Sequence, residues 1–328
     1  MRMQYRLIGA AIAVALAVPA ASAEYDVVFG KNKDWLFTGY EYMKPADAGP
    51  TKISVDNLIE ASKLFKQNGT ALAIMLVPSK IRVYEDQLPG NRPLNDFTRN
   101  QYKNAVAALR AGGVNVVDLD KAFTGMADRY GDNQLFFRLD THWSPKGAML
   151  AAETIKATVD ATPALKSAYA ATKPVEYTLA WSPRARPTRS RDLVNYLPPG
   201  TATFPPEQIK SFRVTRAQPS SAGLTGDGDA VEVTVIGSSF TNANTGYPDA
   251  VRYALQRDVL DISLPVDQGP WSGMVGYLGK EFKTNKPKLV IWEIPERELR
   301  SPPAADWREA RYRIDNTKWL SDMRNLLK

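Results

Sequence analysis

The sequence predicts an α/β protein built on a parallel sheet. Two largely apolar runs, Ala-Leu-Ala-Ile-Met-Leu-Val at 71–77 and Leu-Val-Ile-Trp-Glu-Ile at 289–294, have the pattern of strands covered on both faces. Residues at helical spacing precede and follow the first run, and this alternation of helix and strand is typical of parallel sheets. We therefore expect one domain in which helices cover a central sheet.

The expected elements follow one another in a regular order. Apolar residues at helical spacing, a Ser start and a Gly stop predict a helix over 54–69, and the strand at 71–77 follows it. Ser144 is a natural N-cap and Pro145 suits a first helical turn, so a helix over about 144–160 begins there. Further helices are expected at about 96–111, 248–257, 271–284 and 305–327, and further strands at 114–117, 231–236, 259–263 and 289–294.

A long irregular insertion is expected before the strand at 231–236. Over about 163–229 the chain is rich in Pro, Ser, Thr and Arg. We expect this segment to lie over the sheet and to contain one hairpin. Loops of this length are uncommon in compact domains and are usually functional, so a role facing the substrate and a passive excursion over the surface both remain open.

The first 23 residues predict a secretory signal peptide. Arg2 and Arg6 give a positive start, an apolar run from Leu7 to about Val18 follows, and Ala-Ser-Ala at 21–23 is a small-x-small cleavage site. The apolar run is shorter than the ~20 residues of a membrane-spanning helix. We therefore expect cleavage and export, with an uncleaved membrane anchor as the alternative.

Composition excludes several kinds of site. The chain has no cysteine, which excludes thiolate metal sites and cysteine nucleophiles, and its single histidine excludes a histidine-rich zinc site. A mature chain of about 305 residues can bury a sufficient core without disulfides.

The net charge of +7, about +5 without the signal peptide, fits a polyanionic partner such as a uronic-acid polysaccharide, an anionic membrane surface, or a role in solubility alone. A nucleic-acid role is not expected, because the chain carries no known binding motif.

The only histidine lies in a run that suits a general base. His142 follows Asp140 by two positions in Asp-Thr-His-Trp, and in an extended segment two such residues point to the same side. The carboxylate can then accept a hydrogen bond from the imidazole, fix its tautomer and stabilise its protonated form. A purely structural histidine is the alternative.

A candidate nucleophile follows a predicted strand. The strand at 231–236 runs into a Gly-Ser-Ser turn, which can hold a serine exposed while its own backbone N–H contributes to an oxyanion hole. Of the two serines, Ser238 and Ser239, we favour the second. With Asp140 and His142 it would complete a Ser-His-Asp set for acyl transfer, whereas in the alternative both serines only satisfy the turn.

Other residues are candidates for contacting the substrate. Gly269 could let a second backbone N–H approach the reacting carbonyl, or it could simply form the turn before the next helix. Lys80 and Arg297 could shape the site or form structural ion pairs. The aromatic side chains that could stack on sugar rings or belong to the core are Trp143, Trp181, Trp271 and Tyr247, and a basic run that could contact polymer carboxylates or be solvated is Arg184, Arg186, Arg189 and Arg191.

Together these runs resemble the alginate O-acetyltransferase family of the AlgX and AlgJ type. Asp-Thr-His-Trp with Ser-Pro-x-Gly after it is similar to the family signature, and Gly-Ser-Ser-Phe at 237–240 occupies the place of its nucleophile motif. Supporting similarities are Lys-Asp-Trp-Leu-Phe at 33–37, Val-Pro-Ser-Lys at 77–80 with Tyr84 and Leu-Pro at 88–89 after it, Trp-Glu at 292–293 and Glu-Arg at 296–297. The resemblance covers most of the mature chain apart from the insertion.

The resemblance implies an SGNH-hydrolase-like three-layer fold over 24–328, with the motifs in the permuted order Asp, His, Ser. It also implies a periplasmic enzyme in which Ser239 is the nucleophile, His142 the base and Asp140 its orienting group. Such an enzyme would move an acetyl group through an acyl-serine onto an exopolysaccharide hydroxyl.

The same resemblance implies partners, and two alternative functions remain open. A membrane-bound O-acyltransferase is the expected acetyl supplier, other exopolysaccharide secretion proteins are expected partners, and neither a metal nor a cofactor is expected. A polysaccharide acetyl-esterase with the same triad and a non-catalytic polysaccharide-binding or assembly protein remain alternatives. The sequence does not identify the polymer.

Overall fold

The centre of the protein is a five-stranded parallel sheet. The computed structural model describes residues 26–201, 203–218, 230–305 and 308–328, so the predicted signal peptide at 1–23 lies outside the described residues. The strand order is β10-β9-β11-β3-β4, and every neighbouring pair is parallel. These strands are β3 (Ala71–Val77), β4 (Asn115–Asp118), β9 (Val233–Gly237), β10 (Val259–Ser263) and β11 (Leu289–Pro295). The predicted parallel α/β fold is confirmed.

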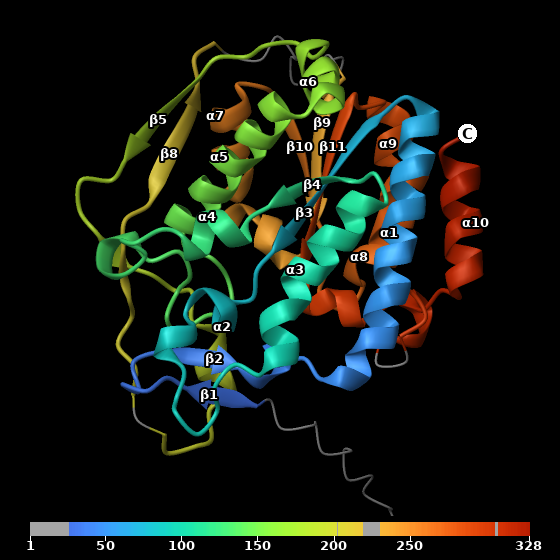
Figure 1. The fold of residues 1–328 in the computed structure, drawn as a ribbon. Helices are drawn as coiled ribbons and strands as arrows, with labels where there is room; N and C mark the ends of the chain where they lie inside the picture. The colour runs from blue at the N-terminus through green and yellow to red at the C-terminus, as the bar shows by residue number, and fades with distance from the viewer. Residues whose placement is uncertain (1–25, 202, 219–229, 306–307) are drawn as a thin grey trace, which may run out of the picture.

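Helices cover both faces of this sheet and make three layers (Figure 1). Side chains along β3 alternate between two separate core clusters, so that Met75 packs in one and Leu76 in the other. One face carries α5 (Pro145–Ala161) and α7 (Tyr247–Leu255). The other carries α1 (Ala48–Asn68), α3 (Asp96–Ala111), α8 (Gly269–Gly279), α9 (Glu281–Asn285) and α10 (Asn316–Leu326). Because both faces of the sheet are buried, the sequences of its strands are continuous apolar runs.

Several predicted boundaries differ from the structure for local reasons. The helix expected to start at residue 54 starts at Ala48, because Pro50 lies in the first turn, where a missing backbone N–H costs little. Ser54 is therefore buried inside α1 rather than capping it. The single helix expected over 271–284 is two, because the backbone leaves helical geometry at Lys280.

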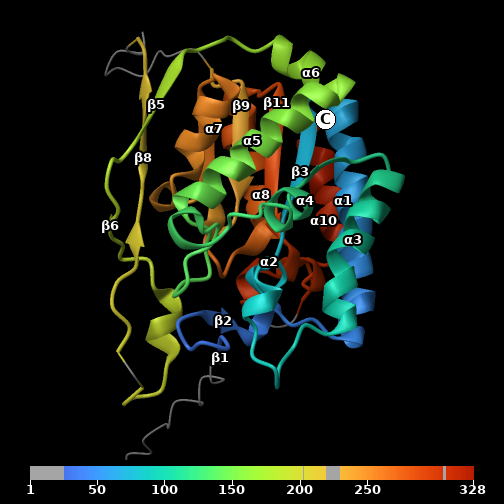
Figure 2. The ribbon, with the colours of Figure 1, turned by 60° about the vertical axis from the view of Figure 1, so that its left-hand side comes forward.

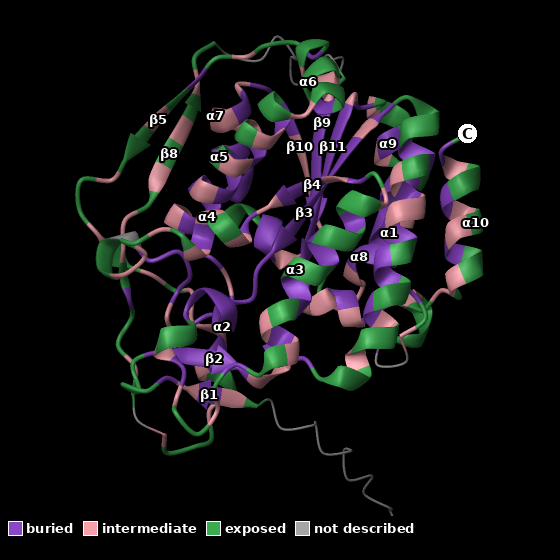
Figure 3. Ribbon diagram, in the orientation of Figure 1, coloured by how far each residue is buried: buried purple, intermediate pink, exposed green. Residues whose placement is uncertain are grey.

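The insertion is more ordered than expected. It begins with α6 (Pro163–Ala170) and then forms two short antiparallel ladders, β5 (Tyr177–Trp181) with β8 (Phe212–Arg216) and β6 (Arg186–Pro187) with β7 (Gln208–Ile209). Figure 2 shows this ribbon running beside α7 along one edge of the molecule. Most of its residues are exposed or half-buried, in contrast to the buried central strands (Figure 3).

Three further features complete the described chain. An antiparallel pair near the N-terminus, β1 (Val27–Phe29) with β2 (Leu36–Thr38), was not predicted. The short helices α2 (Lys80–Val83) and α4 (Asp120–Thr124) follow β3 and β4. Within the described ranges no helix is both long and apolar enough to cross a bilayer.

Candidate active site

The predicted site residues gather at the carboxyl ends of the parallel strands. Ser239 lies two residues after the end of β9, Lys80 follows β3, and Arg297 follows β11. Asp140 and His142 lie in the loop between α4 and α5. In open α/β sheets this edge is where ligands bind.

Three of these side chains form a hydrogen-bonded chain. His142 Nε2 lies 2.8 Å from Ser239 Oγ, and His142 Nδ1 lies 2.7 Å from Asp140 Oδ1. The tautomer that fits places the proton on Nδ1, so that Nδ1–H donates to the carboxylate and Nε2 accepts from the serine hydroxyl. The side chain of His142 is 22% exposed, so a reactant can reach it. This is the arrangement that a Ser-His-Asp acyl-transfer site requires.

The Asp-Thr-His run has a different backbone from the one expected. The predicted extended segment is wrong, because residues 138–142 are bent at the tip of a tight loop. The backbone N–H of His142 donates to Asp140 Oδ1 at 2.9 Å, which forms an Asx-type turn. The loop is closed by hydrogen bonds from Phe137 N to His142 O (3.1 Å) and from Ser144 N to Leu135 O (2.8 Å). The turn, rather than strand periodicity, brings the carboxylate to the imidazole.

Asp140 is held as a carboxylate. Burial raises its pKa, but the hydrogen bond and the charge interaction with His142 and the backbone N–H donors outweigh this effect, so the pKa lies below its usual value. An ionised Asp140 can orient the imidazole and stabilise its protonated form.

The two serines of the turn have different environments. Ser239 opens the 3₁₀ turn Ser239–Thr241 and faces His142, whereas the Ser238 hydroxyl accepts from Phe240 N at 3.3 Å as the cap of that turn. The backbone N–H of Ser238 donates to Glu293 Oε2 at 2.6 Å. A Cβ at Gly237 would collide with the same carboxyl group, so only glycine fits there. Glu293, on the neighbouring strand β11, therefore holds the turn in place.

The Ser239 backbone N–H is available to an oxyanion. It is the first amide of the 3₁₀ turn, so no carbonyl within the turn can accept from it. It forms no hydrogen bond with any of the described residues. The predicted second donor is not supplied by Gly269: its N–H donates to Pro265 O at 3.3 Å, and its α-carbon lies against Arg308. The second-donor role of Gly269 is therefore wrong, and the alternative, a turn before the helix, is the one observed.

The insertion contributes two carboxylates that sequence reasoning missed. Asp192 accepts from Thr141 N at 2.8 Å and from Thr141 Oγ1 at 2.6 Å. Glu207 is buried and accepts from Arg138 N at 2.9 Å and Leu139 N at 2.8 Å. Both hold the backbone of the loop that presents Asp140 and His142. Their only signal in the sequence is that they are isolated acidic residues within basic and proline-rich runs.

Lys80 also supports the loop that presents Asp140 and His142. Its Nζ donates to Leu36 O (2.6 Å), Arg138 O (2.9 Å) and Asp140 O (3.0 Å), and the residue is 1% exposed. All three donors of the ammonium group are used. Burial lowers the pKa of Lys80 to about 8, against the opposing effect of nearby carboxylates. Of the two roles expected for Lys80, shaping the site is the one observed, and the enclosed side chain does not contact a ligand directly.

Three of the four candidate stacking aromatics belong to the core. Trp143 and Tyr247 pack against each other with ring centroids 5.0 Å apart, and Trp271 donates its indole N–H to Ser301 O on the opposite face of the sheet. All three side chains are buried and have no face left for a sugar. Trp181 alone of the four is exposed.

Arg297 lies beside the nucleophile turn without being free to bind substrate. Its Nη1 forms an ion pair with Glu41 Oε1 at 2.9 Å, and its guanidinium lies 5.4 Å from the centroid of Phe240. Phe240 in turn packs against the His142 ring at 5.1 Å. Arg297 therefore braces the turn rather than contacting a ligand directly.

Among the described residues, one cluster resembles a metal site, and hydrogen bonds explain its arrangement. One ligand atom each from Asp140, His142 and Asp192 lie within 4.8 Å of one another. Asp140 Oδ1 and His142 Nδ1 hydrogen-bond to each other, however, and Asp192 accepts twice from Thr141. Their placement needs no ion.

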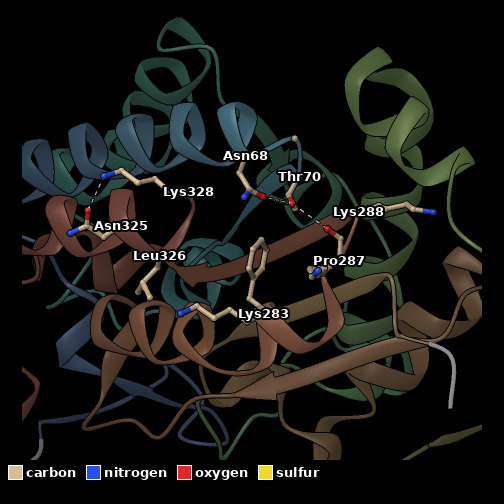
Figure 4. Close-up of a pocket in the computed structure, with 11 residues that line it drawn as sticks. Asn68, Thr70, Lys283, Pro287, Lys288, Asn325, Leu326 and Lys328 are labelled. Carbon is tan, nitrogen blue, oxygen red and sulfur yellow. Dashed lines mark hydrogen bonds between the residues drawn. The ribbon is translucent and has the colours of Figure 1, made fainter. Parts of the chain in front are cut away.

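A basic cavity of about 550 Å³ lies at the other end of the sheet (Figure 4). Thr70 and Pro287 in its wall come shortly before β3 and β11, so it opens at the amino ends of the strands. Lys283 and Lys328 also line it. This cavity is separate from the triad, which lies at the carboxyl ends.

Comparisons with known proteins support the predicted fold and family. Residues 27–296 match the family described as "SGNH hydrolase-like domain, acetyltransferase AlgX". The chain is 30% identical over 299 residues to the probable alginate O-acetylase AlgJ of Pseudomonas aeruginosa, covering 85% of this chain and 71% of that protein. Its fold is similar to the O-acetyltransferase domain of Pseudomonas putida AlgJ, with a TM-score of 0.74, 25% identity and coverage of 92% of this chain and 99% of that one. Pseudomonas aeruginosa AlgX shares the fold, with a TM-score of 0.62, 17% identity and coverage of 87% and 69%.

Proposed function

The chain belongs to the AlgX family of SGNH hydrolase-like acetyltransferases, and from this premise we propose that it acetylates hydroxyl groups of alginate or a similar exopolysaccharide in the periplasm. The observation that carries the proposal is the continuous hydrogen-bonded chain from Asp140 through His142 to Ser239. The predicted signal peptide supports export, and the name of the AlgJ relative supports alginate as the class of acceptor.

The first half-reaction loads the acetyl group onto the protein. Ser239 Oγ attacks the carbonyl carbon of an acetyl donor while His142 Nε2 takes the hydroxyl proton. Asp140 stabilises the resulting imidazolium. The Ser239 backbone N–H donates to the developing oxyanion. When the tetrahedral intermediate collapses, the leaving group takes the proton from His142 and Ser239 retains the acetyl group.

The second half-reaction passes the acetyl group to the sugar. His142 removes the proton of a sugar hydroxyl, whose oxygen attacks the acetyl carbon of acetyl-Ser239. Collapse breaks the bond to Ser239 Oγ, which regains its proton from His142. The products are an acetylated sugar and the free enzyme. In vivo, a membrane-bound O-acyltransferase would supply the acetyl group, and other secretion proteins would present the polymer.

Hydrolysis of a chromogenic acetyl ester tests the triad. Ser239→Ala and His142→Ala should each lower acyl turnover by about 10⁴-fold or more. Ser238→Ala is the matched control: it removes the neighbouring hydroxyl, which does not contact His142, and should keep most of the turnover. Turnover that survives in Ser239→Ala would overturn the mechanism.

An acceptor experiment then separates transfer from hydrolysis. Adding a mannuronate oligosaccharide should divert the acetyl group from free acetate to the sugar, which mass spectrometry would detect. Acetate release that is unchanged by the sugar would identify an esterase. A wild-type protein that binds the oligosaccharide but has no Ser239-dependent turnover would identify a binding protein instead.

A further inference from the structure

A cavity of about 450 Å³ lies between the insertion and the start of α5, and we call it the Trp181 pocket. Its walls come from the end of β5, from Lys210 before β8, from Lys146 in the first turn of α5 and from a turn before the catalytic loop. The lining residues are Asp132, Lys146, Trp181, Ser182, Pro183 and Lys210.

Trp181 presents an aromatic face at this pocket. Trp181 is 38% exposed, so part of its ring is open to a ligand. The ring is held in place by Phe212, its cross-strand partner, with centroids 5.1 Å apart and planes at 71°. Lys146 Nζ lies 6.0 Å from the centroid of the Trp181 ring. The ammonium group lies over the indole ring, and this pair suits a ligand that has both a flat apolar face and a negative charge.

The charges around the pocket favour an anion. Lys210 pairs with Asp132 at 3.3 Å, whereas Lys146 forms no ion pair with any described residue. Downstream of Trp181, Arg184, Arg186 and Arg189 are exposed, and they too form no ion pair with the part of the chain that the structure describes. The pocket and the segment that leaves it therefore carry an excess of positive charge.

Three connections lead from the pocket to the triad. Lys146 is four residues from His142, so their α-carbons are at most about 14 Å apart. The pocket also shares Asp132 with a neighbouring cavity of about 440 Å³ that is lined by Arg138, two residues before Asp140. The segment from Trp181 itself continues to Asp192, which contacts Thr141 and Asp140. These connections place the pocket close to the loop that presents Asp140 and His142.

We propose that the Trp181 pocket binds a uronate residue of the acceptor polysaccharide and so positions the polymer near the triad. Trp181 stacks on the sugar ring, and Lys146, with Lys210, pairs with its carboxylate. The exposed arginines that follow Trp181 contact carboxylates of neighbouring sugars. The identity of the ligand as an acidic polysaccharide rests on the proposed function, whereas the pocket and its charges do not.

Binding to an inactive protein tests the pocket without relying on turnover. In a Ser239→Ala background, titration with a mannuronate oligosaccharide in a calorimeter gives the dissociation constant. Trp181→Ala should weaken binding by about tenfold or more, and Trp181→Phe should keep most of the affinity. Lys146→Gln should weaken binding and reduce its dependence on salt. Lys283→Gln, in the basic cavity at the far end of the sheet, is the matched control and should bind normally (Figure 4).

The outcomes separate this proposal from the proposed function. Normal binding by Trp181→Ala overturns the pocket assignment even if the wild-type protein turns over acetyl esters. If the wild-type protein has no ester turnover, acetyl transfer is overturned, whereas Trp181-dependent binding in the Ser239→Ala background still supports the pocket. Equal affinity for a neutral cello-oligosaccharide overturns the role of Lys146 and Lys210. Ester hydrolysis by the Trp181→Ala single variant should match wild type, and a loss there would show that the substitution damages the triad rather than a subsite.

Discussion

The backbone N–H of Asp192 donates a 2.9 Å hydrogen bond to Oδ2 of Asp140, which lies 52 residues earlier in the chain. Because His142 occupies Oδ1 of the same carboxylate, Asp140 is held from both sides, once by the imidazole and once by the insertion. The insertion is therefore a structural part of the candidate active site and not a passive excursion over the surface.

Asp192→Ala should lower acyl turnover without unfolding the protein. The substitution keeps the backbone N–H but removes the acceptor of both Thr141 hydrogen bonds, which are worth about 1.5–3 kcal/mol when the acceptor is charged. We expect kcat for a chromogenic acetyl ester to fall by about tenfold or more. Asp160→Ala, which removes an exposed carboxylate on α5, is the control. Unchanged kcat in Asp192→Ala would show that the loop keeps its shape without this contact.

Asp140→Asn should preserve the fold and abolish most of the activity. The amide can keep one acceptor for the imidazole, but it no longer stabilises a positive charge on His142 or selects the reactive tautomer, so kcat should fall by about 10⁴-fold. A thermal unfolding curve close to wild type would establish that the loss is chemical. If Asp140→Asn retains near-normal kcat, His142 does not act through this carboxylate.

The sequence predicted those parts of the fold and site that depend on local patterns. The strand at 71–77 is apolar on both faces, so its buried position could be recognised directly, and the Gly-Ser-Ser turn after β9 placed Ser239. What could not be predicted depends on contacts between distant segments. Whether Trp143 or Trp181 is exposed is decided by helix and ribbon packing, and Lys80 binds carbonyls from separate parts of the chain.

Lys80→Met should destabilise the loop that presents the triad. The replacement has a similar length but no donor, so three carbonyl oxygens, including Asp140 O, lose a buried hydrogen bond. Each unsatisfied group costs about 1–3 kcal/mol. We expect a lower midpoint in urea unfolding together with lower kcat, whereas Lys63→Met on the exposed side of α1 should change neither. A variant with wild-type stability and activity would contradict the supporting role of Lys80.

Glu293 lies fully buried beneath the nucleophile turn and accepts the Ser238 backbone N–H at 2.6 Å. Burial raises its pKa to about 7, and this outweighs the opposing hydrogen bonds from Ser238 and the charge of Arg297. The unfolded chain releases this proton near pH 4.5, whereas the folded protein keeps it up to about pH 7. Between these two values the folded state holds more protons, so the free energy of unfolding should fall as the pH rises, and the full loss is present above pH 7.

Glu293→Gln should remove this loss of stability. The amide cannot ionise, and its carbonyl oxygen can still accept from Ser238 N. We expect the free energy of unfolding of the variant, relative to wild type, to increase by about 2–3 kcal/mol between pH 5 and pH 8, because a shift of one pKa unit corresponds to about 1.4 kcal/mol. Urea unfolding at both pH values measures this difference, and comparing the two proteins cancels the other titrating groups. Glu60→Gln on the surface of α1 should give parallel pH curves. Parallel curves for Glu293→Gln would instead mean that Glu293 has the same pKa in the folded and unfolded states.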